Sequence, residues 1–147
     1  MKWSQDQLEI RALARDFAQG ELRSASAGWD AAKDLDAGIF RKLADLGFLG
    51  MLIPEQYGGL DFDLSTYLLV LEELSWGDAS VGLSVAIHNG PVAGLITKHG
   101  SDGQKERWLP LLASGEVLGA FALSEPGAGS DAGSLTTVAE ASGTGWK

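Results

Sequence analysis

The hydrophobic pattern of this 147-residue chain changes once, at residues 113–116, and the change divides the sequence into two parts. Before it, apolar residues recur at the spacing of amphipathic helices. After it, residues 117–123 (VLGAFAL) form a continuous apolar run, which is typical of a buried strand. We therefore expect a helical domain over residues 1–113 and the beginning of a β-domain over residues 114–147, with a second strand over residues 135–140.

Helix-start signals are clear in the first part. Four candidate N-cap residues each precede a segment with helical apolar spacing: Ser4, Asp36, Asp63 and Ser101. Gln7 and Gln104 follow the two serines by three positions, which is the spacing of a capping box. We predict helices that begin just after these four residues, and we expect Gly20 and Gly47 to end the first two.

Two longer apolar segments follow. Residues 64–76 carry apolar side chains around so much of the helix circumference that they predict a central helix buried on several sides. Residues 79–99 are also apolar but contain the triplet 89–91 (NGP). Because proline lacks a backbone N–H and clashes with the preceding turn, this triplet predicts a kink or a break.

Composition excludes several classes of partner and site. Acidic residues number 20 and basic residues 11, and the basic residues are scattered, so nucleic acid is not an expected partner. Cysteine is absent, which excludes disulfides and thiolate metal sites and is consistent with a reducing cytoplasm. Since no uninterrupted apolar run reaches the roughly 18 residues of a membrane span, we expect no span, no targeting segment and a cytoplasmic location.

The segment most informative about function follows the apolar run. Residues 121–131 (FALSEPGAGSD) pass from the predicted strand into a loop with Gly127 and Gly129. Glycine allows positive φ and a close approach of the backbone to a ligand. Backbone amides in such a turn can form an anion-binding concavity, and Ser124 and Ser130 add hydroxyl groups.

An ordinary turn is the alternative interpretation of this loop. Its Pro-Gly and Ser-Asp pairs are common in turns, and Glu125 and Asp131 would repel an anion unless they point away. The spacing of the glycines matches neither the Gly-x-Gly-x-x-Gly dinucleotide motif nor a P-loop. The residues alone therefore predict a polar binding loop without naming its ligand.

Residues 121–131 resemble the first signature of the acyl-CoA dehydrogenase family of flavoenzymes. Residues 46–59 (LGFLGMLIPEQYGG) and 108–116 (WLPLLASGE) resemble the same family in the same order. The resemblance implies a mainly α fold, with an N-terminal orthogonal helical bundle followed by the first strands of a β-barrel-like middle domain. Family members continue into a C-terminal four-helix bundle, so we expect this chain to be incomplete relative to the full family fold.

The resemblance also implies a function: FAD-dependent α,β-dehydrogenation of an acyl-CoA substrate, with electrons passed to an electron-transfer flavoprotein by a dimeric or tetrameric enzyme, commonly a homotetramer. The implied cofactor-binding residues are Phe121, Ala122, Leu123, Ser124, Gly127, Ala128, Gly129 and Ser130. Ser124 would hydrogen-bond the polar edge of the flavin. Ser130 would lie near the FAD pyrophosphate and would also contact the substrate.

No catalytic residue is assigned. The family's catalytic base is a glutamate of the C-terminal part, which we expect after Lys147. Glu72 and Glu73 are interpreted as surface or salt-bridge residues of a helix. His88 and His99 are interpreted as structural or surface residues, and no metal site is predicted.

Two other functions are consistent with these residues. An acyl-CoA oxidase or a flavin monooxygenase on the same scaffold would use oxygen in place of the protein electron acceptor. A non-catalytic helical binding module would need neither the base nor the second flavin-contacting motif of the family, and neither is found in this sequence. The length and branching of the acyl chain are not encoded in the residues that match.

Overall fold

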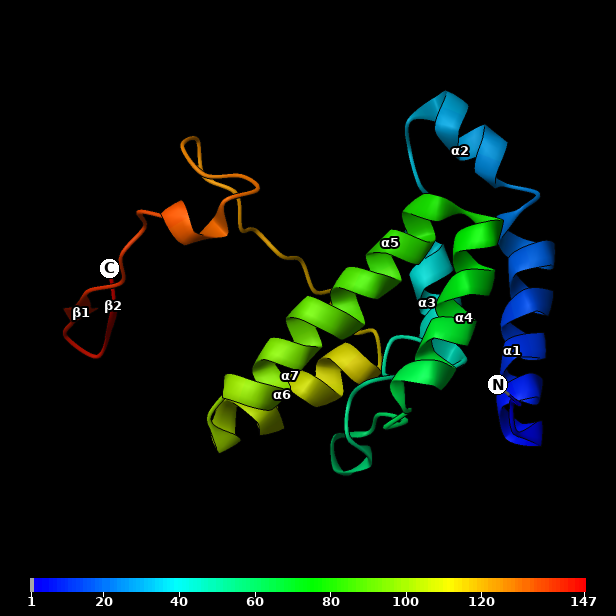
Figure 1. Ribbon diagram of the computed structural model, residues 1–147, viewed down its shortest axis with the longest axis horizontal. Helices are drawn as coiled ribbons and strands as arrows, with labels where there is room; N and C mark the ends of the chain where they lie inside the picture. Colours follow the sequence, from blue (N-terminus) through cyan, green and yellow to red (C-terminus); the bar gives the residue numbers. More distant parts are fainter. Residues whose placement is uncertain (1) are drawn as a thin grey trace.

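The computed structural model describes residues 2–147 as a helical unit followed by an extended tail (Figure 1). The helices are α1 Gln5–Phe17, α2 Ser26–Ala32, α3 Gly38–Asp45, α4 Leu64–Gly77, α5 Ala79–Ile87, α6 Gly94–His99 and α7 Asp102–Ala113. Short π and 3-10 turns are η1 Ala18–Leu22, η2 Glu55–Tyr57, η3 His88–Ala93 and η4 Ala132–Ser134, and the strands are β1 Ala141–Ser142 and β2 Gly145–Trp146. The predicted mainly α fold is confirmed.

The predicted capping interactions form. Ser4 and Ser101 each make a complete capping box, in which the serine accepts a backbone N–H three residues on and the glutamine at that position accepts the serine's own N–H. Asp63 accepts the Thr66 N–H at 2.8 Å and caps α4. Asp36 accepts the N–H of Gly38, where α3 begins. These helix starts depend on contacts within four residues, which is why the sequence predicts them.

The first helix does not end at Gly20 as predicted. It continues through the π turn η1, which brings Leu22 to a fully buried position beside α4. Glycine lowers helix propensity by only about 1 kcal/mol. Burial of a leucine side chain is worth about 2 kcal/mol, so the tertiary contact outweighs the local preference.

The triplet 89–91 perturbs the helix without breaking it. Helices α5 and α6 are continuous through the π turn η3, which contains Pro91. A π turn suits this position because proline cannot donate the normal helical hydrogen bond. The predicted kink or break is thus a local widening, and it places His88 and Asn89 in the interior, at 2% and 0% exposure.

The continuous helix Ala79–His99 is long and apolar enough to cross a membrane by length and composition alone. A core helix of a globular protein meets the same test. Here Val81, Val85 and Ala93 are fully buried in the two hydrophobic clusters of the helical unit. Packing therefore accounts for part of its apolar character, and the absence of a membrane span stays a prediction.

Helix α4 occupies the centre of the larger core cluster, between α1 and α5 (Figure 1). Tyr67, Val70 and Leu74 are buried at helical spacing, as the sequence predicts. Leu68 is half exposed, so α4 has an open side as well as two covered ones. The smaller cluster joins Ile53 to α7 and η3.

The strand predicted at residues 117–123 is wrong, as is the one at 135–140. Both segments are irregular, and Leu118 and Phe121 are about half exposed. A strand needs a hydrogen-bonded neighbour, and none lies beside either segment within residues 2–147. The only ladder described there is the short antiparallel hairpin β1–β2, which pairs Ala141 with Trp146.

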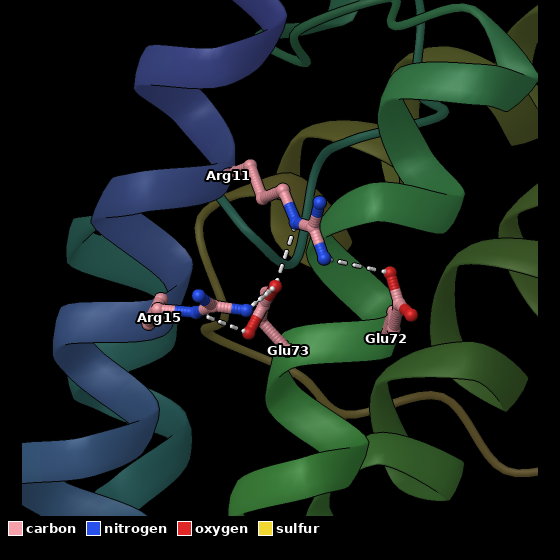
Figure 2. Close-up of polar contacts among 4 residues, drawn as sticks. All are labelled: Arg11, Arg15, Glu72 and Glu73. Atoms are coloured by element: carbon pink, nitrogen blue, oxygen red, sulfur yellow. Dashed lines mark hydrogen bonds and ion pairs between the residues drawn. The ribbon is translucent and has the colours of Figure 1, made fainter. Parts of the chain in front are cut away.

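An ion cluster around the buried Glu73 carboxylate joins α1 to α4 (Figure 2). Arg11 Nε lies 2.6 Å from Glu73 Oε1, and Arg15 Nη2 lies 2.7 Å from the same oxygen. Burial of the Glu73 carboxylate acts to raise its pKa, but hydrogen bonds from Arg15 and Arg11 outweigh burial and hold the pKa below its usual value. Arg11 also reaches the exposed Glu72 at 3.2 Å. The salt-bridge interpretation of Glu73 is therefore confirmed.

Replacing Glu73 with Gln should destabilise the helical unit by about 2 kcal/mol, because charge-assisted hydrogen bonds from two arginines are lost in a buried setting. The measurement is urea-induced unfolding at pH 7. Glu72→Gln is the matched control, and it should cost no more than about 0.5 kcal/mol because its carboxylate is exposed. Equal losses for the two variants would contradict a special role for Glu73.

Candidate cofactor-binding segment

The segment after α7 is attached to the helical unit at two points. Val117 N–H donates to Leu111 O at 3.3 Å, close to the end of α7. Gly119 N–H donates to His88 Nδ1 at 3.1 Å, which ties the segment to the π turn η3. Residues 120–124 then make no hydrogen bond within residues 2–147 and run outward, away from the helices (Figure 1).

His88 is held at both ring nitrogens. Its Nε2 lies 3.1 Å from the carbonyl oxygen of Leu112, and its Nδ1 accepts from Gly119. This pattern requires the neutral tautomer with the proton on Nε2. Burial lowers the pKa of His88, and this effect outweighs the opposing influence of the carbonyls of Leu112 and Leu49. The structural interpretation of His88 is consistent with these contacts.

The loop that follows is closed by Glu125. Its backbone pairs with Ala128 in both directions, at 2.9 and 3.1 Å. Its carboxylate accepts from Thr136 N–H at 2.8 Å, from Thr137 N–H at 2.9 Å and from the Thr136 hydroxyl at 3.1 Å. These hydrogen bonds lower the pKa of Glu125 to about 2, and the bond from the Thr136 backbone N–H has the largest effect.

The two acidic residues of the loop are thus occupied within it. Glu125 accepts from the threonines, and Asp131 accepts from the Ser134 hydroxyl. In the sequence, the negative charges of Glu125 and Asp131 argue against an anionic ligand. Because both carboxylates bind donors of the loop itself, this part of the objection is weakened.

The eight predicted cofactor-binding residues lie together on this segment and its loop. Seven are exposed, and Ala128 is buried at 4% exposure. Neither Gly127 nor Gly129 is in the left-handed region, so the positive φ that glycine allows is not used at either position. A Cβ at either glycine would meet nothing within 4 Å, so the backbone there is open to close approach from outside.

Sequence reasoning did not find the residues that shape the segment. His88 stands among apolar neighbours next to an Asn-Gly-Pro triplet, and that setting was its only signal. Thr136 and Thr137 were interpreted as part of a strand because both are β-branched. Among residues 2–147 there is no group of three or more His, Asp or Glu side chains able to hold a metal ion.

The chain belongs to the acyl-CoA dehydrogenase family. A profile described as the acyl-CoA dehydrogenase N-terminal domain matches residues 4–116. An acyl-CoA dehydrogenase of Bacillus subtilis is 39% identical over 95% of this chain and 37% of its own length. The human mitochondrial short-chain specific acyl-CoA dehydrogenase is 42% identical over 90% of this chain and 32% of its own length. The chain thus spans about a third of these curated relatives.

Solved structures share the fold. A chain in the structure of the electron transferring flavoprotein of Acidaminococcus fermentans aligns over 99% of this chain and 38% of its own, with a TM-score of 0.93 and 34% identity. A glutaryl-CoA dehydrogenase of Mycobacterium smegmatis in complex with FADH2 aligns over 98% of this chain and 37% of its own, with a TM-score of 0.90 and 32% identity. The chain is therefore incomplete relative to these structures, as the sequence predicts.

Replacing Glu125 with Gln should loosen the loop, because the charged acceptor shared by Thr136 and Thr137 is lost. The backbone amide resonances of both threonines should shift in nuclear magnetic resonance (NMR) spectra at pH 7. Since the folded pKa is lowered, the contribution of Glu125 is present above pH 4.5 and is lost as the pH falls through about 2, where the unmodified chain should show the same shifts. Glu116→Gln, on the exposed turn before the segment, is the control and should leave both amides unchanged.

His88 should make stability depend on pH near neutrality. Its folded pKa is below the ordinary value of 6.5, so the unfolded chain takes up the proton first as the pH falls, and stability decreases below pH 6.5. Urea unfolding at pH 7.5 and 5.5 measures this loss. His88→Gln should reduce the difference between the two values, whereas the exposed His99→Gln should retain it. An unchanged difference in the His88 variant would be the contrary result.

Proposed function

We propose that this chain is the N-terminal portion of an FAD-dependent acyl-CoA dehydrogenase, which forms a 2,3-enoyl thioester and passes electrons to an electron-transfer flavoprotein. The observation that carries the proposal is the largely exposed segment 121–131, which extends from a helical unit of this family and is attached to it through Val117 and Gly119. Its relatives include short-chain specific acyl-CoA dehydrogenases, and one neighbour is described as a complex with FADH2. No residue of this chain is assigned as the catalytic base.

The chemistry of the segment suits a flavin. Phe121 and Leu123 are each 43% exposed, and they offer apolar surface to a flat ring. The backbone amides of residues 120–124 are unpaired within residues 2–147, and Ser124 and Ser130 carry exposed hydroxyls that can bind polar ring atoms or a pyrophosphate. When bound, FAD would supply the hydride acceptor. Residues 121–124 would position it, and residues 127–130 would approach its phosphates.

The finer features of the proposal follow the family. We propose a cytoplasmic enzyme that forms a homodimer or homotetramer. It would bind acyl-CoA partly through Ser130 and deliver electrons to an electron-transfer flavoprotein. The neighbour from an electron transferring flavoprotein structure supports the last feature. The net charge of −9 and the scattered basic residues favour a small-molecule substrate over nucleic acid.

The first test is the mass and visible absorption spectrum of the polypeptide purified from its natural gene. We expect a bound flavin, its bleaching by an acyl-CoA without oxygen, and reoxidation by an electron-transfer flavoprotein. Ser124→Ala should weaken FAD binding about tenfold, the loss of one hydrogen bond, whereas Ser24→Ala on the helical unit should not. Rapid reoxidation by oxygen would favour an oxidase, and a folded protein that binds no flavin would overturn the proposal.

A further inference from the structure

The path of the segment toward the predicted cofactor contacts is set by one hydrogen bond between the segment and the π turn η3. The bond from Val117 to Leu111 is local, because it follows the end of α7. The bond from Gly119 N–H to His88 Nδ1 spans 31 residues and is the last hydrogen bond before residues 120–124, which make none within residues 2–147. Within residues 2–147, everything from residue 120 to 124 extends freely from this point.

The imidazole can serve as an anchor because its own position is fixed. The ring is 2% exposed, and its Nε2–H is committed to Leu112 O near the end of α7. One nitrogen therefore binds a helix and the other binds the segment. A ring held in this way loses little further freedom when it accepts the Gly119 amide.

Gly119 and Val92 complete the contact. His88 and Val92 are four residues apart in the continuous helix, so they lie on neighbouring positions of one face. A Cβ at residue 119 would lie 2.6 Å from Val92 Cγ1, closer than real Cβ contacts allow. A side chain at residue 119 would therefore displace either Val92 or the segment.

We propose that His88 is the positioning residue of the flavin-binding segment: by accepting the Gly119 N–H at Nδ1, it fixes the route by which Phe121 and Ser124 leave the helical unit. Its importance for the flavin rests on the proposed function. The hydrogen bond from Gly119 to His88, which we call the anchor, is present in this chain without cofactor. Phe121 is two residues from Gly119, a span of at most about 7 Å, so a shift at the anchor reaches the first predicted flavin contact directly.

Two substitutions separate the two hydrogen bonds of the ring. Asparagine has its polar side-chain atoms at the distance of Nδ1, so His88→Asn retains an acceptor for Gly119 and loses the donor to Leu112. Glutamine reaches as far as Nε2, so His88→Gln retains the donor to Leu112 and loses the acceptor. A role in packing alone would make the two variants behave alike.

The test is amide hydrogen exchange of the 147-residue chain by NMR, without flavin. Gly119 should be protected in the unmodified chain and in His88→Asn. In His88→Gln its exchange should be at least about tenfold faster, with shifts of the resonances of residues 121–124. Fast Gly119 exchange in the unmodified chain, or equal exchange in both variants, would overturn the proposal. His99→Gln is the control and should leave Gly119 protected.

A second pair of variants keeps His88 intact. Gly119→Ala should displace the segment through its clash with Val92, and the double variant Gly119→Ala with Val92→Ala should restore the resonances of residues 121–124. Failure of the double variant to restore them would count against the anchor.

In the flavin-loaded protein, His88→Gln should shift the flavin absorption spectrum and His88→Asn should not. Since exchange is measured without flavin, failure of the anchor is distinguishable from failure of the flavoenzyme proposal.

Discussion

The rest of the structure depends on the hydrogen bonds made by two adjacent buried residues, His88 and Asn89, in the π turn η3. The Asn89 side chain donates to Phe48 O at 3.0 Å and accepts from Leu52 N–H at 3.3 Å, which holds the buried connection between α3 and α4. His88 holds the end of α7 and the segment beyond it. A buried polar group left without a partner costs about 1–3 kcal/mol, so these bonds select one arrangement of otherwise unspecific apolar surfaces.

The ion cluster of α1 and α4 plays a similar part between those two helices. Apolar contacts between the two helices would tolerate sliding, because they are not directional. Glu73, with its carboxylate 3% exposed, accepts from both Arg11 and Arg15 and so allows one register. The arginine stems also cover apolar surface while their charged ends remain partly in water. The polar groups thus set the register of α1 against α4, and most of the stabilisation comes from the burial of apolar side chains.

The two parts of the chain differ in how far sequence reasoning reached. Helix starts at Ser4, Asp63 and Ser101 were predicted correctly because an N-cap binds amides within three residues. The end of the first helix was predicted wrongly, because the burial of Leu22 beside α4 is not visible in local sequence. The strand at 117–123 was also wrong, since a strand exists only when a neighbour pairs with it.

For the candidate site, the sequence by itself determined which residues are predicted to contact a cofactor, because the 121–131 signature is contiguous and its chemistry belongs to its own side chains and amides. Only the tertiary structure decided what holds that signature in place and where its charges point. His88 meets Gly119 across 31 residues, and Glu125 meets Thr136 across 11. Such pairings depend on how helices and loops pack in space. The order of residue types along the chain does not show which distant residues this packing brings together.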